Sequence, residues 1–155
     1  MNPITTRRVA VMLLAHSLRV SNNWSMSVAL RWAWRIEKSD IAARVAGVRY
    51  GRRQTALEHL SRYATNDTFL SLRRESGNAY DRNAVAIIVT VAGRGSVRVG
   101  YLAATTARVV APLLDRGLLV RVGNWSITGG DIMGLQLRLT VGGATRFHRM
   151  HIRIA

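Results

Sequence analysis

The sequence predicts a mainly β fold of the α+β class, in which a helical segment precedes a small β-barrel. Apolar side chains recur at helical spacing in residues 4–38, whereas short strand-like runs separated by glycine and asparagine turns follow from residue 43 onward. The 155 residues amount to about one domain. We therefore expect a helical segment at 1–40, a barrel domain at 43–141 and a basic tail at 142–155.

Two helices are expected in the N-terminal segment, residues 4–20 and 25–38, with residues 21–23 as the turn between them. The second contains Trp32 and Trp34 among other apolar residues and is edged by arginines. Such a helix needs a partner surface, either the barrel or a second subunit. A basic amphipathic helix on a membrane surface is the alternative, although we do not expect a membrane partner.

The barrel region is expected to contain six strands, with one helix after the first strand and another after the fourth. Single helices inserted between strands favour an OB-like or SH3-like barrel over a sandwich. Pro112 is expected to shorten or perturb the second helix near its end, and Asn124 is expected in a loop. The strands are residues 43–50, 68–74, 83–91, 97–102, 118–123 and 135–141, and the helices are residues 55–63 and 104–114.

The charge balance points to a polyanionic partner. Lysine and arginine number 23 against 8 acidic residues, which gives a formal net charge of +15. Lys38 is the single lysine, and guanidinium groups both pair with phosphate and stack on bases. Nucleic acid is therefore favoured over a membrane surface. A genome rich in arginine codons is an alternative reason for arginine instead of lysine, but it does not explain the excess of charge.

The residues that enzymes and metal sites require are not clustered in the sequence. There is no cysteine, which excludes disulfides, thiolate metal sites and cysteine nucleophiles. His148 and His151 have a spacing that suits one helical face but no third ligand nearby. The Gly-Arg-Gly-Ser run at 93–96 is a turn and lacks the ending of a phosphate-binding loop. We therefore expect no enzymatic activity, no metal and no cofactor. The lack of cysteine does not locate the protein, but a bacterial cytoplasm or nucleoid is the expected location, because a reducing cytoplasm is the default for a nucleic-acid binder.

Four motifs follow one another in the barrel region. They are AGVRY at 46–50, LRRESGNAYDRNAV at 72–85, VGYL at 99–102 and a helix that ends in APLLD at 111–115. In this order and spacing they resemble a HIRAN domain, whose pattern runs V-G-x-x-Y, L-x-R-E-P-x-N-P-Y-D-x-N-A-I, V-G-Y-I/L and A-x-x-L-A-x-x-L/M-D. The resemblance covers roughly residues 43–141.

The resemblance implies a fold and a function. HIRAN domains are OB-like barrels found alone in bacterial and phage proteins and fused to SWI/SNF-type remodelling helicases, where the domain captures the 3′ end of single-stranded DNA. It therefore implies a binding module for DNA repair or replication without chemistry of its own. A helicase or nuclease partner protein would supply any reaction. Ser76 and Ala79 replace two prolines of the family pattern, which leaves the rigidity of this loop open.

Site residues are carried over from the family motif position by position. Arg49 and Tyr50 match the Arg-Tyr pair that holds the terminal nucleotides. Tyr80 and Asp81 match the Tyr-Asp pair that shapes the pocket for the 3′-hydroxyl. Gly51 stands where the helicase-like members have a second tyrosine, so one stacking surface is missing.

Physical chemistry supports these assignments and also offers alternatives. Tyrosine rings stack on bases and arginines hold phosphates, while a carboxylate accepts a hydrogen bond from a free sugar hydroxyl. Asp81 is alternatively a turn residue that bonds its own backbone, and Tyr101 alternatively packs in the barrel. Arg73 and Arg74 point to opposite faces of a strand, and family position favours Arg74 for the groove. The predicted site comprises Arg49, Tyr50, Arg74, Asn78, Tyr80, Asp81 and Tyr101.

Two further functions share part of this reasoning. An RNA-binding accessory protein on the same barrel would use the same charge and stacking. A metal-dependent nuclease would need clustered carboxylates, whereas the eight acidic residues are scattered along the chain. We therefore expect single-stranded DNA as the main partner, with RNA as the alternative.

Overall fold

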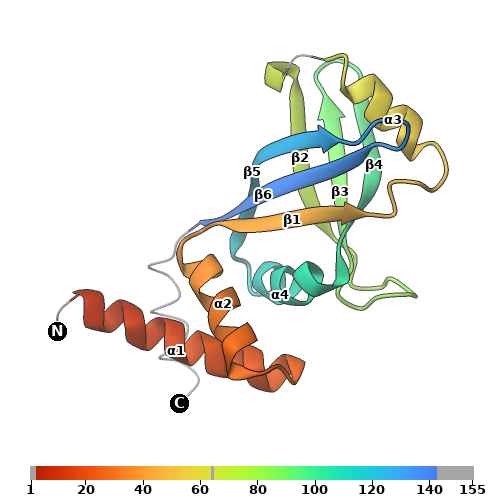
Figure 1. The fold of residues 1–155 in the computed structure, drawn as a ribbon. Coiled ribbons are helices and arrows are strands. Elements are labelled where there is room, and N and C mark those ends of the chain that lie inside the picture. The colour runs from red at the N-terminus through yellow and green to blue at the C-terminus, as the bar shows by residue number, and fades with distance from the viewer. Residues whose placement is uncertain (1–2, 64, 143–155) are drawn as a thin grey trace. The chain divides into compact units, whose positions relative to one another are not determined.

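The computed structural model describes residues 3–63 and 65–142 (Figure 1). The chain divides into two compact units, one with the two N-terminal helices and one spanning Ala42–Leu139. The helices are α1 (Pro3–Asn22), α2 (Met26–Glu37), α3 (Arg53–Leu60), the short 3-10 helix η1 (Thr65–Asp67) and α4 (Ala104–Asp115), and the strands are β1 (Ile41–Ala46), β2 (Thr68–Arg74), β3 (Val85–Val91), β4 (Gly95–Leu102), β5 (Leu119–Thr128) and β6 (Gly134–Gly142).

The helical unit consists of α1 and α2 packed against each other. Ser25 caps α2, because its hydroxyl accepts the Val28 N–H at 3.4 Å. The rings of Trp24 and Trp32 stack at a centroid distance of 6.2 Å, and Trp32 is buried. The predicted N-terminal helices are thus confirmed. No helix in the described part of the chain is both long and apolar enough to cross a bilayer.

The second unit is built on one six-stranded sheet in the order β2-β3-β4-β1-β6-β5. The two edge strands, β2 and β5, contact each other, so the sheet curls into a nearly closed barrel (Figure 1). Helix α4 packs against β2, β3 and β5. The predicted α+β fold with an OB-like barrel is therefore confirmed. Its fully buried side chains include Leu57, Val85, Ile87, Val99, Val109, Val110, Leu135 and Leu139.

Several element boundaries differ from those expected, and three of the differences have a clear physical reason. Strand β1 ends at Ala46 because Gly47 has a φ of +74° and begins a turn. The expectation that Asn124 lies in a loop is wrong, because β5 continues to Thr128. Much of β5 is exposed, so its sequence lacks the apolar alternation that marks a half-buried strand. Helix α4 continues past Pro112 to Asp115, since a proline in the last turn removes only one helical hydrogen bond.

A bulge in β4 changes the direction of its side chains. The register pairs Ile88 with Arg98 and Ile87 with Gly100, so Val99 is an extra residue on β4. In a regular strand, residues three apart point to opposite faces. The extra residue instead brings Arg98 and Tyr101 to the same side of the sheet, where both contact one carboxylate.

Close approach of β4 to β1 requires a glycine at position 100. A Cβ there would lie 2.5 Å from the Ala46 carbonyl oxygen and 2.6 Å from Val45 Cγ1. These positions belong to the stretch where the two strands pair, with Ala46 opposite Tyr101. Any side chain at Gly100 therefore pushes the strands apart.

We predict that Gly100→Ala lowers the free energy of unfolding by about 1–3 kcal/mol, as overpacking of a close contact does. Urea unfolding followed by circular dichroism measures the change. Gly77→Ala is the matched control, because a Cβ at Gly77 meets no atom within 4 Å. Equal midpoints for the two variants would contradict the close strand approach.

Candidate nucleic-acid interface

A groove of about 740 Å³ opens on the barrel, and we call it the main groove. Its walls come from the turn after β1, the first residue of α3, the loop between β2 and β3, and the end of β4. Five of the seven predicted site residues line it, which are Tyr50, Asn78, Tyr80, Asp81 and Tyr101. Arg53 and Arg98 line it as well. The predicted motifs thus meet in one concave site.

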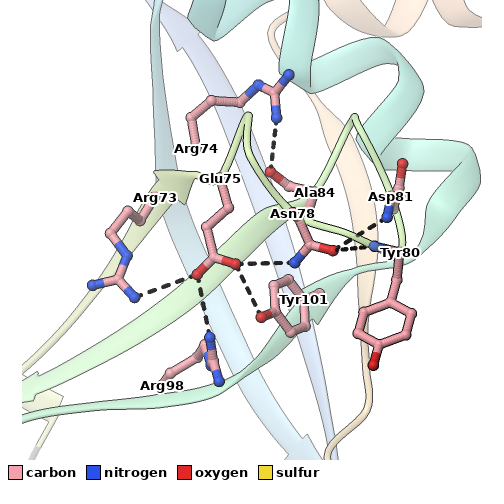
Figure 2. Close-up of polar contacts among 9 residues, drawn as sticks. All are labelled: Arg73, Arg74, Glu75, Asn78, Tyr80, Asp81, Ala84, Arg98 and Tyr101. Atoms are coloured by element: carbon pink, nitrogen blue, oxygen red, sulfur yellow. Dashed lines mark hydrogen bonds and ion pairs between the residues drawn. The ribbon is translucent and has the colours of Figure 1, made fainter.

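Glu75 binds three of the residues that line this groove (Figure 2). Its carboxylate accepts hydrogen bonds from Asn78 Nδ2 at 3.2 Å and from the Tyr101 hydroxyl at 3.0 Å. It also pairs with Arg73 at 3.4 Å and with Arg98 at 3.3 Å. The side chain is only 20% exposed. One carboxylate therefore ties the β2–β3 loop to strand β4.

These contacts change the pKa of Glu75. Burial raises its pKa, because the charged form is desolvated. The hydrogen bonds from Asn78, Tyr101, Arg73 and Arg98 favour the charged form and lower the pKa by more than burial raises it. The net pKa lies below its ordinary value, so Glu75 is an anion at neutral pH.

The loop between β2 and β3 is shaped by two of the predicted site residues. Asn78 Oδ1 accepts the backbone N–H of Tyr80 at 2.9 Å and that of Asp81 at 3.2 Å. Asp81 Oδ1 accepts the N–H of Asn83 at 2.8 Å, so the turn role of Asp81 is confirmed. Asp81 lines the groove, and its second carboxylate oxygen has no bonding partner among the described residues.

Two tyrosine rings stand free at the rim. Tyr80 is 99% exposed and Tyr50 is 73% exposed. Figure 2 shows the Tyr80 ring pointing away from the Glu75 network. Tyr101 differs, because it is half-buried and its ring centroid lies 5.7 Å from the Arg53 guanidinium and 5.2 Å from that of Arg98. The groove therefore has two open aromatic faces and one that is flanked by cations.

Arg74 lies outside the groove lining, on the opposite side of the strand from Arg73 (Figure 2). Its guanidinium donates two hydrogen bonds to Asp115, at 2.9 and 3.2 Å. It also donates to the carbonyls of Ala84 at 3.1 Å and Arg82 at 2.7 Å. Arg74 thus fastens the far end of the loop to the end of α4. This contact and the Asn78 hydrogen bonds restrain the loop, whose rigidity the sequence left open.

A second hollow of about 400 Å³ continues the main groove, and we call it the arginine hollow. It shares Tyr50, Arg53 and Arg98 with the main groove, so the two spaces adjoin. Arg52 and Arg73 complete its basic wall. Guanidinium groups arranged in this way suit the phosphates of an extended polyanion.

Sequence reasoning missed Arg53 and Arg98. Arg53 Nη1 donates to the Gly47 carbonyl at 2.6 Å, a contact for which no local pattern exists. Arg98 reaches the groove only because of the bulge at Val99. The predicted Arg49 is exposed and lies outside the groove lining. His148 and His151 lie outside the described residues.

We predict that acid destabilises the protein partly through Glu75. Because its folded pKa is lowered, its contribution to stability is full above the ordinary glutamate pKa and is lost as pH falls through the lower folded value. Glu75→Gln should therefore be less stable than wild type at neutral pH and lose less stability on acidification. Urea unfolding from about pH 7 down to about pH 3 measures this.

Glu58→Gln serves as the control for this experiment. Glu58 forms an exposed i,i+4 pair with Arg62 at 2.9 Å, which is worth at most about 0.5 kcal/mol. The Glu58→Gln variant should therefore keep the wild-type dependence of stability on pH. Identical acid sensitivity of Glu75→Gln and wild type would contradict the role of Glu75.

Comparison with known proteins places these features in a family. The family model described as HIRAN domain matches residues 39–141, more than half of the chain. A solved protein from Lactobacillus plantarum is 24% identical, with 65% of this chain and 94% of that chain covered and a TM-score of 0.44. The HIRAN domain of human HLTF is 20% identical, with 72% and 82% covered and a TM-score of 0.48. No curated protein sequence matches. The chain belongs to the HIRAN domain family.

Proposed function

We propose that the protein binds single-stranded DNA in the main groove, takes a free 3′-hydroxyl end there, and catalyses no reaction on it. One observation carries the proposal. Two exposed tyrosine rings line a groove that Asp81 also lines and that continues into the arginine hollow, and one carboxylate oxygen of Asp81 has no partner among the described residues. A helicase or nuclease partner would supply any chemistry.

Stacking and charge supply the affinity in this proposal. Tyr50 and Tyr80 have open faces, and a base stacked on a tyrosine contributes about 1–3 kcal/mol. Arg52, Arg53 and Arg73 line the arginine hollow. Phosphates bound there would release the counterions of the nucleic acid, which favours binding. Stacking needs unpaired bases, which favours a single strand over a duplex.

The distribution of charge supports recognition of an end. Arg73 and Arg98 neutralise Glu75, whereas Asp81 has no ion pair among the described residues. A lone carboxylate repels phosphate but accepts a hydrogen bond from a sugar hydroxyl. The terminal hydroxyl is therefore placed beside Asp81, and the strand continues toward the arginine hollow.

Fluorescence anisotropy with matched single-stranded DNA, single-stranded RNA and duplex tests the ligand class. Affinity for single-stranded DNA should fall linearly in a log-log plot against salt, with a slope of about −0.7 for each phosphate contacted. Arg52→Gln should lower the magnitude of this slope by about 0.7, because Arg52 lines the arginine hollow without an acidic partner among the described residues and its loss removes one phosphate contact. Tighter binding of RNA than of DNA would make RNA the ligand.

Arg121→Gln is the control for the salt experiment. Arg121 is exposed on β5 and lies outside both the main groove and the arginine hollow. It should leave the salt slope at the wild-type value. A salt-independent affinity of the wild-type protein would overturn the proposed phosphate contacts.

Asp81→Asn tests recognition of the end. Asparagine keeps an oxygen for the Asn83 N–H, so the turn survives, while the repulsion of phosphate and the charged acceptor are lost. Wild type should prefer a 3′-hydroxyl strand over a 3′-phosphate strand, and Asp81→Asn should lose about 1.5–3 kcal/mol of this preference. Binding at internal positions should stay nearly unchanged.

Two controls accompany this variant. Strands that differ only in 5′ phosphorylation should bind alike, and Asp81→Asn should melt like wild type. Asp81→Ala, which removes the turn acceptor as well, should melt at a lower temperature. If wild type binds 3′-hydroxyl and 3′-phosphate strands equally, Asp81 serves only the turn.

A further inference from the structure

A third hollow lies beyond the arginine hollow, and we call it the Tyr63 hollow. Its volume is about 170 Å³. One wall comes from α3 and the residues just after it, and the other comes from the hairpin of β3 and β4. The lining residues are Ala56, His59, Leu60, Tyr63, Val89, Val91, Arg94, Gly95, Ser96 and Val97.

The Tyr63 hollow continues the path of the two sites already described. Val97, which is 47% exposed, lines both the arginine hollow and the Tyr63 hollow. The main groove, the arginine hollow and the Tyr63 hollow therefore follow one another along β4. From Arg98 back to Gly95 the strand rises roughly 10 Å at about 3.3 Å per residue. A strand whose end lies beside Asp81 must therefore extend beyond the main groove to reach this hollow.

The chemistry of the main groove recurs here. The Arg94 guanidinium lies 5.1 Å from the centroid of the Tyr63 ring, as those of Arg53 and Arg98 lie against Tyr101. Leu60 and Val97 add apolar surface beside this pair. Among the described residues that line the Tyr63 hollow, none is acidic, in contrast to Asp81 in the main groove.

This combination fits an interior nucleotide. A base needs a flat apolar or aromatic surface, and its phosphate needs a cation at the rim. An interior nucleotide has no free 3′-hydroxyl, so it needs no carboxylate acceptor.

We propose that the Tyr63 hollow is a second nucleotide-binding site, which takes an interior nucleotide of the strand whose end lies in the main groove. This inference rests on the proposed function. It assigns Tyr63 and Arg94 to the base and to its phosphate, respectively. The bound strand then runs from Asp81 past the arginines to the tip of the β3–β4 hairpin.

The length dependence of binding tests this site. Anisotropy measures oligothymidylates of increasing length, from the dinucleotide upward, each with a free 3′-hydroxyl. Wild-type affinity should rise once the strand is long enough to reach Tyr63 and then level off. Tyr63→Leu and Arg94→Gln should each weaken binding of the longer strands by about tenfold and leave the affinity for the dinucleotide unchanged.

Controls separate binding from packing, since the contact of Arg94 with Tyr63 also holds the hairpin against the residues after α3. Tyr63→Leu retains apolar bulk, and both variants should melt close to wild type. Arg121→Gln, which removes an exposed arginine elsewhere, should keep the full length dependence. Equal losses for the dinucleotide and the long strands would assign Tyr63 and Arg94 to packing and overturn the second site.

Photocrosslinking gives a second measurement. Strands that carry 5-iodouracil at successive positions should crosslink to Tyr63 from an interior position and not from the 3′-terminal one. Wild type that binds the dinucleotide and the long strands equally would overturn the second site but leave the proposed function intact. Failure of every oligonucleotide to bind would overturn both.

Discussion

The site depends on one half-buried anion in a strongly basic protein. Glu75 accepts hydrogen bonds from Arg73 on its own strand, from Asn78 in the loop and from Arg98 and Tyr101 on β4, and these contacts hold three residues of the main groove in place. A carboxylate with several donors is much more favourable than an unpaired buried charge. The arginines that flank it repel one another, and the shared anion offsets this repulsion. The arrangement of cations in the groove is thus set by a residue that itself carries the opposite charge.

The arginines therefore have different roles on the surface, depending on whether they pair with a carboxylate. Where arginines pair with Glu75 or Asp115, they shape the protein, as Arg74 does between α4 and the loop. Arg52 and Arg94 line hollows without an acidic partner among the described residues. The net charge alone does not distinguish these roles, because every arginine contributes equally to it.

The sequence predicted the features that depend on local pattern. Helical periodicity located α1 and α2, and apolar alternation located β2 at its observed bounds. The motif order brought Tyr50, Asn78, Tyr80, Asp81 and Tyr101 into one groove. These residues are close because each is at or near the end of a strand or in the following loop.

The remaining features depend on long-range geometry. The bulge at Val99 has no signature in a run of alternating residues, and without it Arg98 would be assigned to the opposite face. The opposite roles of Arg73 and Arg74 depend on Asp115, which lies 41 residues from Arg74. Strand parity showed that the two arginines lie on opposite faces, but it does not show that Arg73 is the one that lines the arginine hollow.

The ion pair of Arg74 and Asp115 also makes helix α4 and the β2–β3 loop thermodynamically linked. Asp115 is half exposed, so cations in solution have access to its carboxylate. Any ligand that takes this carboxylate releases Arg74, and the loop then loses the restraint on its Arg82 and Ala84 carbonyls. By reciprocity, a strand that requires the restrained loop disfavours that ligand to the same extent. A ligand bound at the end of α4, which lies outside the groove, would therefore change the order of the loop.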